Sequence, residues 1–146
     1  MAGIALEQLR EEDVRALVRH PDPERRASAA QSICRTVRAA ELSPVERAFA
    51  HKLLDYIAQD TVAVVRRALA ITLKNSPELP RSVAKKLVAD IDNIAIPILA
   101  HSPVLTDEDL VDVLRSKAAA KIIAVARRPK VSGTVVREIV RFGDSH

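Results

Sequence analysis

The chain has 146 residues and a net charge of +4, with 23 lysines and arginines against 19 aspartates and glutamates. This length suits one domain with its own core, and 48% of the residues are apolar although only two phenylalanines, one tyrosine and no tryptophan occur. Three glycines argue against a glycine-rich phosphate loop, and the scarcity of aromatic side chains leaves few groups that could stack on bases or sugars.

The N-terminal part predicts two helices. One is expected from about residue 12 to residue 19, because His20-Pro21 follows and the residue before a proline avoids the helical region. Asp22-Pro23-Glu24 is typical of a helix start, with a capping aspartate, a proline at the first helical position and an acid in the first turn. This second helix is expected to reach about residue 39 and to bury one apolar face that includes Ile33, Cys34 and Val37.

A fuller start signal occurs at Ser43-Pro44-Val45-Glu46, where the serine and the glutamate can form a capping box. The helix after it is expected to end near Gln59. Its buried face is predicted to contain Phe49 together with Leu53, Leu54 and Ile57, with Tyr56 at the edge. Asp60 is then expected to cap the next helix.

A period of 26 residues governs the rest of the chain. Its markers are Pro77, Pro103 and Pro129, and the apolar residues around them keep the same step. Four positions before each proline stand Leu73, Leu99 and Val125. A fixed period with helical spacing on both sides of a turn is typical of a stacked array of helical repeats.

Each repeat predicts two helices joined by the proline turn. The second helices are expected to begin at Pro80, Thr106 and Ser132, with Thr106 in a capping box. The first helices of the last two repeats, about 93–101 and 118–127, are apolar nearly all round. Such helices predict neighbours that cover them on both sides.

Pro97 is the local exception in this pattern. A proline inside a helix costs about 3 kcal/mol, because it removes a backbone hydrogen bond and its ring clashes with the preceding turn. Pro97 is therefore expected in the first turn of its helix, with Asp92 or Asn93 as the cap.

These patterns predict an all-α fold, a right-handed α-solenoid of about ten short helices in stacked antiparallel pairs. Residues 1–146 are expected to form a single helical-repeat domain. It would contain irregular repeats over residues 1–59 and repeats with the 26-residue period over residues 60–141.

Two resemblances agree with this prediction. Asp60, followed by Val65-Arg66, Ala70 and Leu73, resembles the signature of HEAT repeats, which implies a ladder of aspartates and arginines between repeats. A longer series of short motifs, in a fixed order along the chain, resembles a bacterial family of unknown function. Members of that family begin with HEAT-like or leucine-rich-repeat-variant helical repeats. The motifs include Ser43-Pro44-Val45-Glu46-Arg47, Ile94-Ala95-Ile96-Pro97-Ile98-Leu99, Ser102-Pro103-Val104-Leu105-Thr106-Asp107 and Ala126-Arg127-Arg128-Pro129. This resemblance implies a HEAT-like α-solenoid and no particular chemistry. Phe142-Gly143-Asp144 looks like the start of a further repeat, so we expect the natural protein to continue past His146.

Residues that could carry out chemistry are few. The single cysteine, Cys34, cannot form an intramolecular disulfide and is expected in the core. His51 and Asp55 lie one helical turn apart but lack a third ligand, and the acids after Thr106 lack the glycine and distal glutamate of a calcium loop. The chain is therefore not expected to be an enzyme or to bind a metal or cofactor.

The basic residues supply two candidate binding surfaces for a partner. One is the face of the second helices, with Arg81, Lys85, Arg115, Arg137 and Arg141. The other is the ridge of proline turns, with Arg127, Arg128 and Lys130.

The leading functional expectation is a non-catalytic scaffold for protein–protein interaction whose partner has an acidic surface. The alternative is a nucleic-acid-binding domain that uses the mildly basic C-terminal part, where residues 61–146 carry 14 basic and 9 acidic side chains. A homodimer through the C-terminal end is also considered, because Val135, Val136, Ile139 and Val140 would be poorly covered there. The sequence shows no membrane segment, and we expect a cytoplasmic protein.

Overall fold

Residues 9–143, the part of the chain that the computed structural model describes, form nine α-helices and no strand. The helices are α2 (Glu11–Arg19), α3 (Pro23–Ala39), α4 (Pro44–Ala58), α5 (Ala63–Leu73), α6 (Arg81–Val88), α7 (Asp92–His101), α8 (Asp107–Arg115), α9 (Ala119–Ala126) and α10 (Gly133–Gly143). The all-α prediction is confirmed, and over the described range the helix count is nine where about ten were expected.

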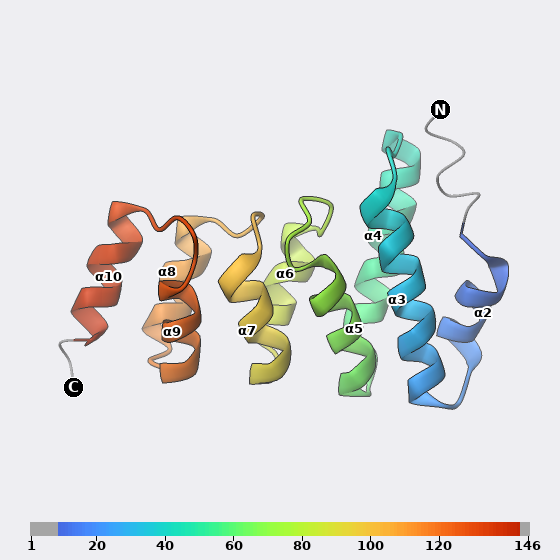
Figure 1. Cartoon of the computed structure of the whole chain (residues 1–146), viewed down its shortest axis with the longest axis horizontal. Helices are drawn as coiled ribbons and strands as arrows, with labels where there is room; N and C mark the ends of the chain where they lie inside the picture. The colour runs from blue at the N-terminus through green and yellow to red at the C-terminus, as the bar shows by residue number, and fades with distance from the viewer. Residues whose placement is uncertain (1–8, 144–146) are drawn as a thin grey trace.

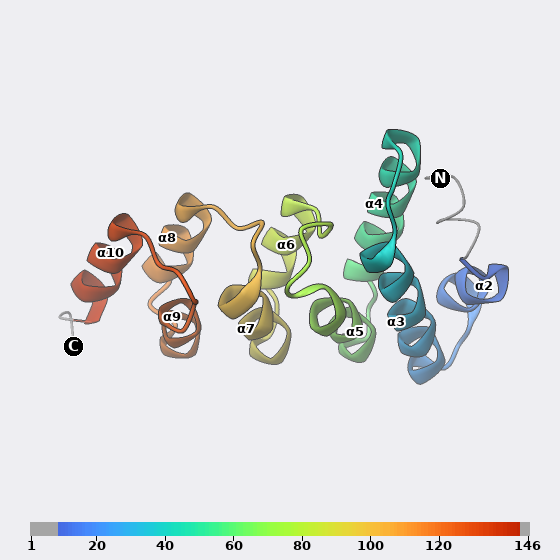
Figure 2. The ribbon, with the colours of Figure 1, turned by 45° about the horizontal axis from the view of Figure 1, so that its top comes forward.

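The helices lie in two layers along the long axis of the molecule (Figures 1 and 2). One layer contains α3, α5, α7 and α9, each packed against the next, with α2 against the free side of α3. The other layer contains α4, α6, α8 and α10. Contacts between α4 and α5, α6 and α7, and α8 and α9 join the layers, so each helix pair packs against its neighbours in the row.

The 26-residue period sets the register of this arrangement. The second-layer helices α6, α8 and α10 begin at Arg81, Asp107 and Gly133, which are 26 residues apart. In the first layer, the equivalent side chains Leu73, Leu99 and Val125 are all fully buried. The second-layer helix starts and these buried positions therefore recur at the 26-residue spacing read from the sequence.

The predicted caps are confirmed at three helix starts and wrong at two, because the N-cap of α7 is Ile91 and not Asp92 or Asn93, and that of α5 is not Asp60. Ser43 and Glu46 form a capping box on α4, Thr106 and Asp109 form another on α8, and Asp22 caps α3. Helix α5, however, begins later than predicted. Val62 takes its N-cap position without a side-chain bond, while Asp60 accepts the backbone N–H of Val62 from outside the helix.

Pro97 lies inside α7 rather than in its first turn, because the helix already begins at Asp92. A proline has no N–H, so the carbonyl of Asn93, four residues earlier, receives no helical hydrogen bond at this point. Asn93 is an exposed residue in the first turn of α7.

Several side chains predicted to be buried are exposed. Phe49 on α4 is 48% exposed, while Leu54 and Ile57 of the same helix are buried. Tyr56, expected at the edge of that face, is 46% exposed. In α9, Ile123 is 51% exposed, so this apolar helix is not covered on both sides. The fold therefore leaves large apolar side chains on the surfaces of both layers.

Candidate functional site

The cations predicted to bind a partner lie in two parts of the structure. On the second layer, Arg81 and Lys85 belong to α6, Arg115 to α8, and Arg137 and Arg141 to α10. Around the turn after α9 lie Arg127, Arg128 and Lys130. Their surroundings differ, and several of them take part in holding the fold together.

Arg81 joins two repeats. Its Nε and Nη2 donate to the two carboxylate oxygens of Asp109, at 2.9 and 2.8 Å, and so connect α6 to α8. The Asp109 side chain is only 3% exposed and also accepts the backbone N–H of Thr106. The hydrogen bond from Arg81 outweighs the effect of burial and lowers the pKa of the Asp109 carboxyl to about 2. Arg81 therefore has a structural role, because it holds α6 and α8 together.

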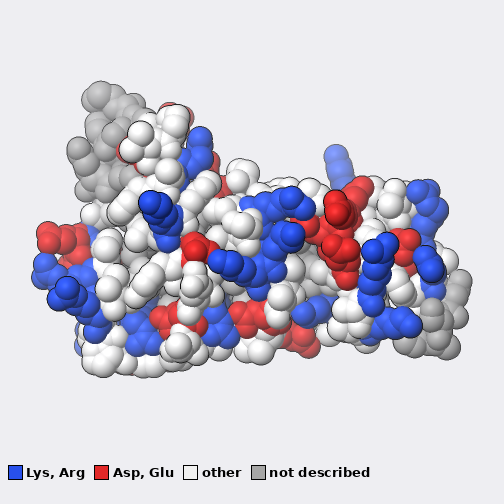
Figure 3. All heavy atoms as spheres, turned by 180° about the vertical axis from the view of Figure 1, so that it is seen from behind, with Lys and Arg blue, Asp and Glu red and all other residues white. Residues whose placement is uncertain are grey.

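The other cations of this face do not form a continuous basic stripe. Three of them contact residues one turn away on their own helix: Arg115 with Asp112, Arg137 with Thr134, and Arg141 with Glu138. Lys85 is exposed, but its equivalent on α8 is the buried Val111. Figure 3 shows acidic side chains lying between the basic groups on this side of the molecule.

Of the three cations in the turn after α9, one is bonded within the fold and two are exposed. Arg128 is half-buried, and its Nη1 and Nη2 donate to the carbonyls of Leu99 and Ser102, both at 2.6 Å. Burial lowers the pKa of Arg128, as expected of a guanidinium partly withdrawn from water. Arg128 therefore covers the C-terminal end of α7, whereas Arg127 and Lys130 stay exposed.

A ladder of charge pairs connects the loops that precede the first-layer helices. Arg26 of α3 pairs with Asp60, and Arg66 of α5 pairs with Asp90. Each arginine also donates to the backbone carbonyl six residues before it, at 3.0 and 2.8 Å. The HEAT resemblance implied such a ladder, but the partner of Arg66 is Asp90 and not the residue one full period further on, Asp92. The shorter loop before α7 shifts the carboxylate.

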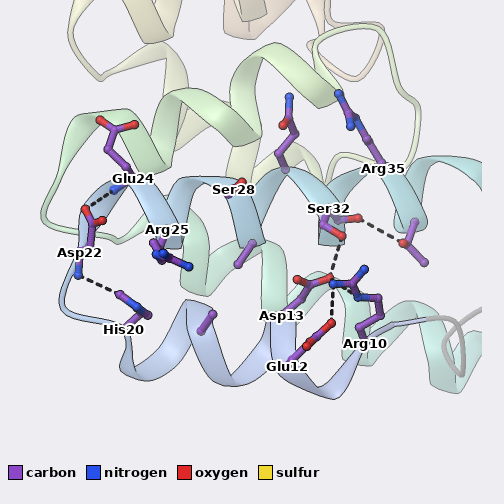
Figure 4. A pocket seen from close by; sticks show the side chains of 14 residues that line it. Arg10, Glu12, Asp13, His20, Asp22, Glu24, Arg25, Ser28, Ser32 and Arg35 are labelled. Atoms are coloured by element: carbon purple, nitrogen blue, oxygen red, sulfur yellow. Dashed lines mark hydrogen bonds and ion pairs between the residues drawn. The ribbon is translucent and has the colours of Figure 1, made fainter.

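The groove between α2 and α3 has a volume of about 860 Å³ and mostly polar walls (Figure 4). Arg10 forms ion pairs with two of its acids, Glu12 and Asp13. Asp13 accepts the Ser32 hydroxyl at 2.7 Å and faces Arg10, while the backbone N–H of Asp22 donates to Nδ1 of His20. The groove therefore joins two helices through polar contacts and offers no grouped set of reactive side chains.

A second groove, of about 500 Å³, lies between α7 and α9 and has a different character. Six apolar residues line it: Ile96, Pro97, Ala100, Ala120, Ile123 and Ala124. Its other lining residues are Lys74, His101 and Arg127. The sequence signal for this groove was the all-round apolar character of α7 and α9. That apolar character predicts buried helices, so of the residues that line this groove only Arg127 is among the predicted site residues.

The described residues contain no group of three or more His, Cys, Asp or Glu side chains that could hold a metal ion. Cys34 is buried, and burial raises the pKa of its thiol to about 12, which leaves it unreactive at neutral pH. In the same part of the chain, no helix combines the length and apolar character that crossing a bilayer requires.

The comparisons with known proteins give one family match. Residues 94–146, which include nearly all of α7 and the helices after it, match a family described as an uncharacterised protein conserved in bacteria (DUF2336). No curated protein and no solved structure matches the chain. The C-terminal part of the chain is therefore similar to a bacterial family without an assigned function, as one of the two resemblances implied.

Proposed function

We propose that this chain is a non-catalytic scaffold for protein–protein interaction, built as a right-handed α-solenoid of the HEAT-like type. The observation that carries the proposal is the set of large apolar side chains left exposed on helices that are already packed in the array. Phe49 and Tyr56 on α4 and Ile71 and Ile123 in the other layer are the main examples. Phe49 and Tyr56 are seven residues apart and so share one face of α4, and exposed apolar and aromatic side chains that share a face are typical of sites that bind proteins.

The pairing of the cations supports the same proposal over the nucleic-acid alternative. A surface that follows a phosphate backbone needs several aligned, available cations. Here Arg81 and Arg128 are used within the fold, and Asp109 and Asp112 lie among the candidates on the second layer. The remaining exposed cations are better suited to the rim of a protein interface.

Affinity capture tests the proposal. The full chain is immobilised, exposed to a bacterial lysate, and compared with the Phe49→Ser/Tyr56→Ser and Ile71→Ser/Ile123→Ser variants. We expect discrete proteins that the wild type retains and that at least one variant loses, with thermal unfolding unchanged. If no protein is retained, and labelled duplex DNA binds with an affinity that falls steeply between about 50 and 200 mM salt, the nucleic-acid function replaces this proposal.

Self-association through α10 is the third function considered. Val136 and Val140 are exposed on this last described helix, whereas Val135 is buried. Light scattering at increasing protein concentration tests it: a mass that doubles and returns to the monomer value in Val140→Asp supports a dimer, and a constant monomer mass excludes one.

A further inference from the structure

The groove between α7 and α9 is lined by residues at helical spacing on both helices. Four small residues line the groove at helical spacing: Pro97 and Ala100 on α7, and Ala120 and Ala124 on α9. The groove axis therefore follows the helix axes. The small side chains keep the floor low, so another helix can approach at the usual interaxial distance of about 8–10 Å.

Most of the apolar residues of α7 and α9 that line the groove are not fully buried. Helices that are apolar all round are normally buried on every side. Here Ile98 and Leu99 are fully buried in the core, but Ile96 is only half-buried and Ile123 is exposed. The repeat array thus covers one side of α7 and α9 and leaves the other open at the groove.

The charge around the groove is of one sign. Lys74, directly after α5, and Arg127, directly after α9, line it together with His101, and none of its lining residues is acidic. Among the described residues, no hydrogen bond or ion pair engages the side chains of Lys74 and Arg127. The nearby Asp107 interacts with Arg128. A ligand with carboxylates at this end of the groove would therefore meet available cations.

We propose, on the basis of the scaffold function proposed above, that this groove binds an acidic amphipathic helix of another protein. Its aliphatic residues, at spacings i, i+3 or i+4, and i+7, lie on the apolar floor. Its carboxylates lie at the end formed by Lys74, His101 and Arg127. The lengths of α7 and α9, 10 and 8 residues, allow contact over roughly two to three helical turns.

Other ligands fit this groove less well. An added β-strand needs a sheet edge with a row of unpaired backbone groups, whereas the groove walls are helices whose interior backbone groups, except the Asn93 carbonyl, bond within the helix. A nucleic-acid strand needs aligned cations along its phosphates and aromatic rings for its bases. The floor here is aliphatic, and the two lysine and arginine side chains that line the groove lie at one end only.

A displayed library of random peptides of about 16 residues, long enough for the helical contact, provides the test. Peptides are selected on the full chain, and the enriched sequences are synthesised with a fluorescent label. We expect aliphatic residues at helical spacing with flanking Asp or Glu. Their affinity should fall about tenfold or more in Ile123→Asp and in Lys74→Glu/Arg127→Glu, but persist in Ile123→Leu. Val45→Asp, at an 81% exposed site on α4, is the matched control.

The outcomes separate this inference from the scaffold function. Peptides without the acidic amphipathic pattern, or peptides whose affinity is unchanged in Ile123→Asp, would overturn the groove assignment. If their binding were lost instead in Phe49→Ser/Tyr56→Ser, the scaffold function would stand with a different site. Enrichment of no peptide, combined with salt-sensitive binding of labelled duplex DNA, would remove both proposals. Circular dichroism of each variant checks that the helices remain folded.

Discussion

Arg66 fixes the positions of two successive loops through one side chain. Its Nε lies 2.6 Å from Oδ2 of Asp90 and its Nη2 3.0 Å from Oδ1, while its Nη1 donates to the carbonyl of Asp60 at 2.8 Å. The loops before α5 and α7 are thereby held in register. This hydrogen bonding, with burial opposing it, raises the pKa of Arg66 and lowers that of Asp90, so both stay ionised.

Removing this guanidinium should strongly destabilise the array. Arg66→Ala leaves the partly buried Asp90 carboxylate without its partner, which costs about 3 kcal/mol in the free energy of unfolding. The stability of Arg66→Lys should lie between those of Arg66→Ala and the wild type, because a lysine cannot donate to both carboxylate oxygens in the same planar geometry. Urea unfolding measures the effect. The adjacent exposed Arg67→Ala is the control, and equal losses in both variants would contradict the assigned role.

The Arg81–Asp109 pair predicts a specific loss of stability in acid. The folded-state pKa of Asp109, about 2, lies below the ordinary value of 3.8, so the ionised carboxylate stabilises the fold above about pH 4. This contribution, roughly 2 kcal/mol, should be lost as the pH falls from 4 toward 2. The free energies of unfolding of the wild type and Asp109→Asn, measured at a series of pH values, should therefore converge as the pH falls over this range. Asp112→Asn, at an exposed site, is the control. If the wild type and Asp109→Asn lose stability equally as the pH falls, the Arg81–Asp109 pair is not the cause of the acid sensitivity.

The sequence predicted the features that depend on neighbouring residues. The capping boxes at Ser43 and Thr106 involve residues three positions apart, so their geometry is set by the local helix start. The 26-residue frame also came directly from spacing. Packing between repeats was predicted less well. Phe49 matches the apolar face of α4, but α4 has 15 residues and α6 only 8, so part of that face extends past its neighbour (Figure 1).

The candidate site was predicted only in part, because a list of cations does not show which are already bonded. Arg81 and Arg128 looked like surface charges, yet their partners Asp109 and Leu99 lie 28 and 29 residues away. Arg127, the neighbour of Arg128, lines the groove. A period in the sequence indicates which positions are equivalent, but the direction of each side chain depends on the loop before its helix.

Pro97 provides a test of the helix start observed in α7. Because the proline lies in the helix interior, Pro97→Ala should restore an N–H donor to the carbonyl of Asn93 and remove the ring clash. The greater freedom of the unfolded chain offsets part of this gain, so we expect a net stabilisation of about 1–2 kcal/mol. Thermal unfolding measures it. Pro103→Ala, in the turn after the helix, is the control, and a lower melting temperature for Pro97→Ala would contradict the interior placement.

Leu99 tests whether the stacked helices stabilise one another. Its side chain is fully buried on α7, which packs against both α5 and α9. Leu99→Ala removes these contacts and leaves a cavity, so the free energy of unfolding should fall by about 2–5 kcal/mol. In an array stabilised by nearest-neighbour contacts, amide hydrogen exchange should then quicken in α5 and α9 as well as in α7. Ile123→Ala, at a half-exposed site on the neighbouring helix, should cost about 1 kcal/mol or less. A melting curve of Leu99→Ala that matches the wild type would show that the repeat frame is wrong, and faster exchange confined to α7 would show that the helices are not coupled.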